Sequence, residues 1–194
     1  MLSDLNKLDS LKDAFQSLSP LSEESLSEIA AITQSLYVKK GTVIQDIGQT
    51  CKNLYFIQKG SLRIFYFFNG LDVTEDFEFE NSFVARGESL LTMKPSNKGI
   101  EAIEDSHLLQ INTPKLFALF VNHIDIERAF HKIIEFSYIQ QINRLESLQF
   151  LSAEDRYNQL LKEFPQAVQR IPLKYIASYL GITQVSLSRI RSKK

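Results

Sequence analysis

The chain shows three successive patterns of apolar and polar positions. Residues 3–36 carry apolar residues at helical spacing, interrupted at Ser19-Pro20, which predicts two helices, the second beginning at Ser22. From Tyr37 to about Asn112 the apolar residues form short alternating or aromatic-rich runs cut by glycines, which is typical of an all-β roll or sandwich. These runs are YVKKG, TVIQDIG, NLYFIQKG, SLRIFYFFNG, VTEDFEFEN and HLLQIN, and the turn glycines are Gly41, Gly48, Gly60 and Gly70.

The third pattern, after Thr113-Pro114, is helical again. A short helix is predicted for residues 114–121 and a long one for about residues 125–149, a stretch without glycine or proline. The long helix is apolar on more than one side. One stripe can face the β domain, and a second copy of the helix across a twofold axis is the simplest cover for the other. The apolar residues are Ile126, Ala129, Phe130, Ile133, Ile134, Phe136, Ile139, Ile142, Leu145 and Leu148.

The chain closes on the stretch IPLKYIASYLGITQVSLSRIRSKK, which follows a helix predicted from about Ser152 to the residue before Pro165. Two short helices around a tight turn at Gly181 fit this stretch, with Thr183 as N-cap of the second helix. Ala177 lies where a small residue lets the two helices approach. The positions expected to face inward are Ile176, Leu180, Ile182, Leu187 and Ile190.

Charge is distributed unevenly along the chain. The 22 basic and 23 acidic residues give a net charge of −1, but the last carboxylate is Glu163 and six basic residues follow it. Residues 1–163 therefore carry −7 and the tail +6, which indicates an anionic partner for the tail, either nucleic acid or a membrane surface. A solvated charged tail is the alternative. The six basic residues are Arg170, Lys174, Arg189, Arg191, Lys193 and Lys194.

The outward face of the second closing helix carries polar groups suited to DNA. Gln184 can bond adenine and Arg189 can bond guanine, each through two hydrogen bonds, while lysines contact phosphates. The alternative is an amphipathic helical hairpin that only closes the core. We predict a DNA-binding surface made of Lys174, Thr183, Gln184, Ser186, Ser188 and Arg189, with Lys193 and Lys194 also on phosphates.

Composition also argues against several protein classes. The single cysteine, Cys51, excludes an intrachain disulfide and suits a reducing cytoplasm. No apolar run approaches the ~20 residues of a membrane-spanning helix, so we expect a soluble cytoplasmic protein. A β-roll enzyme of the cupin type would need clustered His and Glu ligands, but His107 is the only histidine in the β region. We predict no enzymatic activity, no metal and no cofactor.

The whole chain resembles the cyclic AMP receptor protein/FNR family of bacterial transcription regulators. The segment KKGTVIQDIGQTCKNLYFIQKGSLRIFY is similar to the family's β-roll, and IPLKYIASYLGITQVSLSRI is similar to its helix-turn-helix, with Arg189 at the position of a base-contacting Arg. The resemblance implies an α+β fold: an N-terminal double-stranded β-helix, jelly-roll-like and flanked by helices, at residues 1–122. A dimerisation helix at 123–150 and a C-terminal helix-turn-helix domain with a reduced wing at 151–194 would follow. It also implies a homodimer that binds an inverted-repeat operator and contacts RNA polymerase.

One family motif departs from its pattern. Members that bind cyclic nucleotides carry F-x-G-E, with an Arg-Ser pair about ten residues after the Glu. Anchored on Phe83, the matching positions are Ala85, Arg86, Ser96 and Asn97. A cation therefore replaces the ribose-binding Glu, and a serine replaces the phosphate-binding Arg. We expect this degenerate cassette not to bind cyclic nucleotides, and the sequence identifies no other effector.

Two alternatives remain at this point. Gly87-Glu88 is a shifted match to the cassette, but only Lys94 and Lys98 follow it, and a lysine lacks the bidentate fork of arginine. A ligand-binding or scaffold protein that no longer binds DNA is the alternative function.

Overall fold

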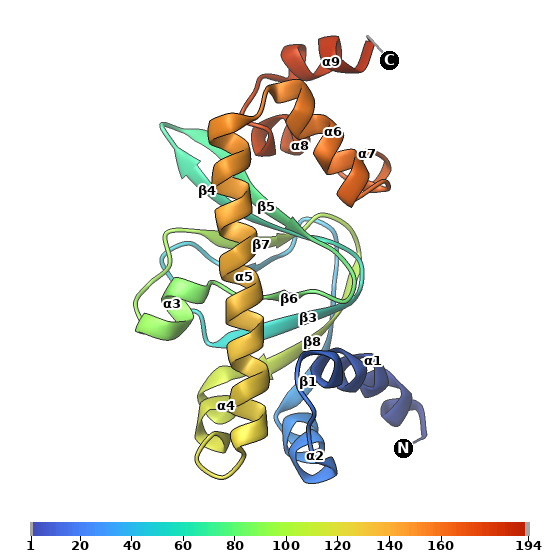
Figure 1. Ribbon diagram of the computed structural model, residues 1–194, viewed down its shortest axis with the longest axis vertical. Helices are drawn as coiled ribbons and strands as arrows, with labels where there is room; N and C mark the ends of the chain where they lie inside the picture. Colours follow the sequence, from blue (N-terminus) through green and yellow to red (C-terminus); the bar gives the residue numbers. More distant parts are fainter. Residues whose placement is uncertain (1, 193–194) are drawn as a thin grey trace.

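The structure is a computed structural model that describes the backbone of residues 2–192 and the side chains of residues 8–192. Two four-stranded antiparallel sheets form a β-roll, with strand orders β1-β8-β3-β6 and β2-β7-β4-β5 (Figure 1). The mixed α+β prediction with a β-roll is thus confirmed. The strands are β1 (Thr33–Val38), β2 (Val43–Gln45), β3 (Asn53–Lys59), β4 (Leu62–Phe68), β5 (Leu71–Glu78), β6 (Phe83–Val84), β7 (Gly99–Ala102) and β8 (Ser106–Asn112).

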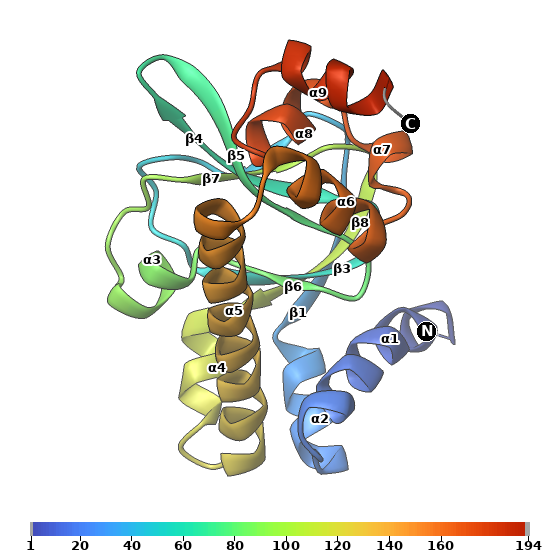
Figure 2. The same ribbon diagram turned by 45° about the horizontal axis from the view of Figure 1, so that its top comes forward.

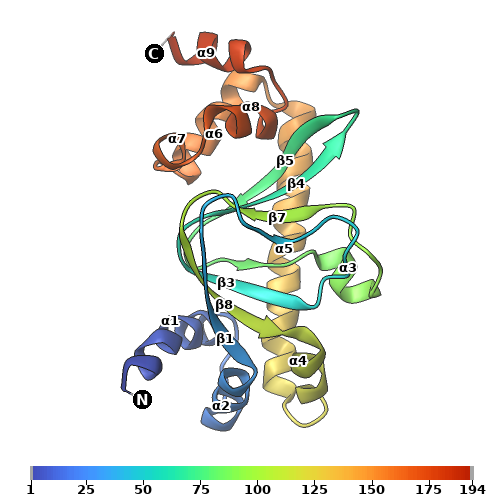
Figure 3. The ribbon, with the colours of Figure 1, turned by 180° about the vertical axis from the view of Figure 1, so that it is seen from behind.

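Helices surround the roll on both sides. Figure 3 shows α1 and α2 below the sheets and the C-terminal helices above them, with the long α5 running between the two ends. Between residues 113 and 192 the structure contains helices and no strand. The helices are α1 (Leu2–Leu18), α2 (Glu23–Ala31), α3 (Gly87–Thr92), α4 (Thr113–Leu119), α5 (Ile124–Phe150), α6 (Ala153–Glu163), α7 (Ala167–Arg170), α8 (Leu173–Tyr179) and α9 (Gln184–Ser192).

The predicted helix through residue 36 is wrong in its last residues. Residues 33–36 belong to β1, in which Thr33 pairs with Ile111 and Val38 with Ser106. The backbone N–H and C=O groups of these residues pair with β8, which is distant in the sequence. A local pattern therefore cannot reveal this strand. The hydrophobic pattern did not predict β7, α3 or α7. These elements are four to six residues long, which is too short for the period of a strand or a helix to be recognised.

The strands of the roll are buried on both faces. On β3, Tyr55 and Ile57 point into a core between the two sheets, whereas Leu54 and Phe56 point outward into a second core. This alternation follows from the two-residue period of a strand. Each outer sheet face is therefore apolar and requires a cover.

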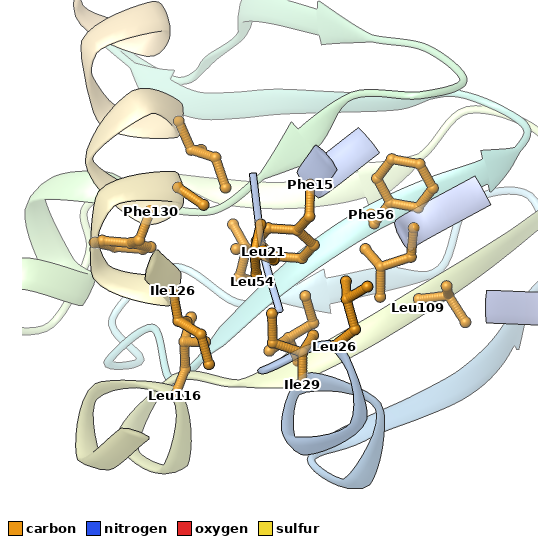
Figure 4. Packing of buried hydrophobic residues seen from close by; sticks show 14 of the residues in the cluster. Phe15, Leu21, Leu26, Ile29, Leu54, Phe56, Leu109, Leu116, Ile126 and Phe130 are labelled. Carbon is orange, nitrogen blue, oxygen red and sulfur yellow. The ribbon is translucent and has the colours of Figure 1, made fainter. Parts of the chain in front are cut away.

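Helices α1, α2, α4 and α5 cover the outer face of the β1-β8-β3-β6 sheet (Figure 4). Phe15 of α1 and Phe56 of β3 are fully buried, and Phe83 packs against both, with ring centroids 5.0 and 5.1 Å away. The first part of α5 supplies Ile126 and Phe130 to the same core. Burial of each such side chain is worth about 1.5–3 kcal/mol, so this core fixes α5 on the roll.

The C-terminal helices cover the other sheet. Phe77 of β5 and Phe79 just after this strand lie in a core shared with α6, α7, α8 and α9, and Phe79 stacks on Phe164 with centroids 4.7 Å apart. In Figure 2 these helices sit directly over β5. The roll and the C-terminal helices are therefore joined by an apolar core as well as by the chain.

Gly60→Ala tests the β3–β4 turn. Gly60 has φ +106°, and an added Cβ would lie 2.1 Å from Ser106 Oγ and 2.8 Å from Ser106 Cα. Backbone strain and overpacking should together lower the free energy of unfolding by about 2–4 kcal/mol in urea titration. Gly41→Ala is the matched control, because its φ is +82° but nothing lies within 4 Å of the added Cβ. Equal losses at the two sites would contradict the predicted clash.

Candidate functional site

The closing stretch folds as two short helices joined by a tight turn. Helix α8 follows Pro172, and Gly181 makes the turn with φ +67°. The N–H of Ile182 donates to the carbonyl of Ala177 at 3.0 Å. Thr183 caps α9, since its hydroxyl accepts from the Ser186 N–H at 3.2 Å. The expected N-cap and turn residues therefore occupy these positions.

The two faces of α9 differ in chemistry. Leu187 and Ile190 are buried with Ile176, Ala177 and Leu180 of the preceding helix and its end, while Ile182 is partly buried. On the other face, the exposed side chains are Gln184, Val185, Ser188 and Arg189, with Ser186 half-buried beside them. Lys174 on α8 is also exposed, whereas Lys193 and Lys194 lie outside the described residues. No carboxylate side chain occurs from residue 171 to the end of the chain, so this surface is uniformly basic or neutral.

Helix α8 is held on β5 by polar contacts. The Thr74 N–H donates to the Ser178 hydroxyl at 2.9 Å. The ring of Tyr175 lies 3.7 Å from the guanidinium carbon of Arg63. Arg63 is only 3% exposed and donates to Asp72 at 2.6 and 2.8 Å and to a Glu101 oxygen at 2.6 Å. Helix α8 thus packs on a buried arginine whose charge is paired with two carboxylates.

A second arginine joins α7 to the roll. Arg170 donates to Glu80 at 2.6 and 2.9 Å and to Glu104 at 3.0 Å. Burial acts to raise the pKa of Glu80, but hydrogen bonds from Arg170 and the Gly60 N–H outweigh it, so that pKa is lowered. Arg170 therefore makes a structural contact between α7 and the roll. Counting the charges of the basic tail did not distinguish it from Lys174 and Arg189.

A cavity of about 850 Å³ lies between α5 and the roll. Its lining comes from α1, β5, β6, α3 and α5. Of the degenerate cassette, Phe83, Ala85 and Arg86 line the cavity. Ser96 and Asn97 are not among the lining residues, because the Ser96 hydroxyl closes a turn with the carbonyl and N–H of Lys98. Lys98, which follows the shifted cassette match Gly87-Glu88, does line the cavity.

The two cavity cations are already paired. Arg86 donates to Glu75 at 3.2 Å, and Lys98 also donates to Glu75. Arg86 is 13% exposed, and its Nε is the one buried side-chain nitrogen or oxygen among the described residues that has no hydrogen-bond partner. An incoming anion would have to compete with Glu75 for both cations.

Sequence reasoning missed the acidic strand that faces this cavity. Asp76 and Glu78 line it together with Glu75, whereas Phe77 and Phe79 point to the C-terminal helices. The run TEDFEFE contains the signal, because alternating acidic and aromatic residues on a strand place carboxylates on one face. Burial raises the pKa of Asp76 to about 6. Burial and then the nearby charge of Asp76 raise the pKa of Glu78 to about 8.

The comparisons with known proteins agree with this architecture. Residues 35–123 match the family model of the cyclic nucleotide-binding domain. Over this segment the chain is similar to that domain family. No curated protein sequence matches the chain. Helices α1 and α2 and all of α5–α9 lie outside the matched segment.

Solved structures resemble the chain well beyond this cyclic nucleotide-binding-type domain. FixK2 from Bradyrhizobium japonicum is 16% identical, with a TM-score of 0.73 and 84% of each chain covered. A protein from Eubacterium rectale described as a transcriptional regulator of the crp/fnr family is 19% identical, with a TM-score of 0.71, covering 88% of this chain and 82% of that one. CLP from Xanthomonas campestris, described as a c-di-GMP responsive global regulator, is 17% identical, with a TM-score of 0.69, covering 89% and 91%. The predicted resemblance is confirmed, and at these identities it shows the shared fold.

Two further findings concern residues 2–192 alone. No helix in this range is long and apolar enough to cross a membrane. The described side chains form no group of three or more His, Cys, Asp or Glu residues placed to hold a metal ion.

Glu78→Gln tests the charge of the cavity. The pKa of Glu78 rises from 4.5 to about 8 on folding, so between these values the folded state binds more protons and stability falls as pH rises. Removing the ionisable group should make the variant progressively more stable than wild type from pH 5 to 8, reaching about 1–3 kcal/mol. Urea unfolding across this range measures the difference. Glu88→Gln, an exposed carboxylate of the same cavity, is the control, and a similar pH-dependent gain there would contradict the assignment.

Proposed function

We propose that this chain is a sequence-specific DNA-binding transcription regulator that acts as a homodimer and does not respond to cyclic nucleotides. The carboxylate-free outer face of α9, with exposed Gln184, Ser188 and Arg189, is the observation that carries the proposal. Double-stranded DNA is polyanionic, and a helix of this kind fits its major groove. The solved structures of similar fold include proteins described as transcription regulators, which supports the same class.

The side chains of α9 divide into two roles. Gln184 and Arg189 contact base edges, because both can form bidentate hydrogen bonds with a base. Ser186 and Ser188 add hydrogen bonds at the same surface, and Thr183 acts mainly as the helix cap. Lys174 contacts phosphate, as do the terminal lysines. Binding of RNA polymerase is part of the proposed class of regulator.

The second half of α5 forms the dimer interface. From residue 135 to 146 every side chain except that of Arg144 is exposed, although five of them are large and apolar. A helix with this much uncovered apolar surface requires a partner, and an antiparallel or parallel copy of itself buries both surfaces at once. The apolar residues of this exposed half are Phe136, Tyr138, Ile139, Ile142, Leu145, Leu148 and Phe150.

Cyclic nucleotides do not bind the cavity with physiological affinity. Their phosphate would require a cation, yet Arg86 and Lys98 both pair with Glu75, and the nearby Asp76 carboxylate adds negative charge. Burying an anion without its partner carries a desolvation penalty of several kcal/mol. The charge balance of the cavity therefore supports an effector of another class.

Arg189→Ala and Lys174→Ala separate the two DNA-binding roles. Arg189→Ala should relax the preference at one base pair of each half-site by about 1–3 kcal/mol. Lys174→Ala should weaken all sequences about equally and reduce the salt dependence by about one unit. Operator sequences are first selected from random DNA by the purified protein, and inverted half-sites about one helical turn apart are expected. Each variant is then titrated against the single-base variants of that operator.

Arg128→Ala is the control for this experiment, since Arg128 is an exposed cation on α5 far along the chain from α9, and it should leave binding unchanged. An equal loss on every operator variant with Arg189→Ala would contradict its base-contacting role. Absence of any selected sequence would overturn the proposed function itself.

Ile139→Asp and Ile142→Asp test the dimer. Their side chains are 55% and 37% exposed, so each variant should stay folded and become monomeric by light scattering at ~10 μM. Ile133→Asp should instead unfold the protein, because Ile133 is 6% exposed and packs in the protein's own core. His131→Asp, at an exposed position nearer the start of α5, should remain dimeric. A wild-type protein that is monomeric at this concentration would refute the interface.

A further inference from the structure

Strand β5 separates the cavity from the C-terminal helices. One of its faces carries Phe77, which packs on those helices together with Phe79 just after the strand, and the other carries Asp76 and Glu78, which line the cavity. Arg144 of α5 stands beside this strand, where its charge acts on Asp76. Its guanidinium nevertheless donates to the carbonyl of Tyr179 and lies 3.8 Å from the ring of the same residue. The arginine is thus engaged with α8.

The two carboxyl groups of this wall lack ionic partners. None of the ion pairs formed by the described residues includes Asp76 or Glu78. Asp76 accepts from the Phe77 N–H at 2.9 Å and from Gln141 at 3.5 Å, which is the limit of a hydrogen bond. Glu78 has a hydrogen bond with the Ser82 side chain. Glu75, in contrast, is neutralised by its two cations.

The remaining wall mixes apolar side chains with polar ones such as Ser137 and Gln140, and it holds one buried donor without a partner. Leu54, Ile64 and Val84 line the cavity from the roll, and Phe130 and Ile133 line it from α5. A volume of about 850 Å³ lies within the range of small-molecule sites. The buried Nε of Arg86 at this cavity has no partner and would need an acceptor atom. The cavity therefore combines several apolar side chains, two carboxyl groups outside any ion pair and one buried donor without a partner.

We propose that this cavity binds a small organic cation, with an amine or guanidinium head at Asp76 and Glu78, an apolar body against α5, and an oxygen acceptor at Arg86 Nε. A cation supplies the missing ionic partner of both carboxyl groups, whereas an anion would be repelled by the Asp76 carboxylate. The inference rests on the proposed function only in treating the cavity as an effector site. The ligand class follows from the charges of the cavity itself.

Binding of a cation has a second consequence that can be measured. Burial keeps the pKa of Glu78 at about 8 in the empty cavity, so at pH 7 this carboxyl group is largely protonated. A bound cation favours the ionised form and lowers that pKa, which releases a proton to the buffer. The binding enthalpy should therefore change with the ionisation enthalpy of the buffer.

Tyramine is a suitable probe, because it joins an aromatic body and a hydroxyl oxygen to an amine. Tyrosol is its neutral control, in which a hydroxyl replaces the amine, and cyclic AMP is the anionic control. Calorimetric titration of the full chain should give a dissociation constant below about 1 mM for tyramine, at least tenfold weaker binding of tyrosol, and no heat with cyclic AMP. The tyramine enthalpy should differ between phosphate and Tris at pH 7.

Asp76→Asn/Glu78→Gln should weaken tyramine binding at least tenfold, whereas Glu88→Gln at an exposed position of the same cavity should change it less than twofold. Thermal unfolding of each variant confirms that it is folded. No binding of tyramine at 10 mM, unchanged affinity in the double variant, or tighter binding of cyclic AMP would each overturn the inference.

Operator binding of the same variants is measured in parallel. Tyramine binding by a protein that selects no DNA would support the ligand class and overturn the proposed function. The converse result would overturn only the ligand class.

Discussion

The two sheets of the roll bury side chains on both of their faces, and this constraint determines where the helices lie. Because successive side chains of a strand alternate, a strand that fills the space between the sheets can also present apolar groups outward, as β3 does with Leu54 and Phe56. Phe56 on β3 and Phe77 on β5 are such outward groups, and both are nearly inaccessible to solvent. Leaving either outer face in water would forfeit about 1.5–3 kcal/mol for each large side chain. The N-terminal helices and the start of α5 cover one face, and α6–α9 cover the other.

This arrangement places the cavity on one side of β5 and the C-terminal helices on the other. A displacement of the strand toward or away from the cavity also moves Phe77 and Phe79, on which the C-terminal helices rest. Protein interiors are close-packed, so such a movement is transmitted to neighbouring elements instead of being absorbed. Arg144 adds a second connection, since it lies near Asp76 and bonds to Tyr179. The cavity is therefore connected to α8 through residues that contact or adjoin one another in turn.

Buried charges set the geometry at both sites. Arg63 and Arg170 are each paired with two carboxylates and thereby hold α8 and α7 on the roll. Removing a carboxylate partner of Arg63, which is 3% exposed, would leave its charge unpaired in a region of low dielectric, which is more costly than the pair is stabilising. In the cavity, Glu75 satisfies Arg86 and Lys98 in the same way. The consequence is that cations present in the sequence are not automatically free to bind an anion.

The sequence by itself determined the order of the elements and the chemistry of the last helix. Alternating runs and glycines located most of the strands, and Gly181 with Thr183 located the final turn and cap, because these signals depend on local backbone geometry. Only the tertiary structure decided which charged side chains pair with one another. It separated Arg170, which joins α7 to the roll, from Arg189, which is exposed, although both belong to the same basic tail. It also turned Glu75 toward the cations of the cavity, and it left Asp76 and Glu78 without ionic partners. The reason is physical: the environment of a charge depends on residues brought near it by folding, and those residues are distant in the sequence.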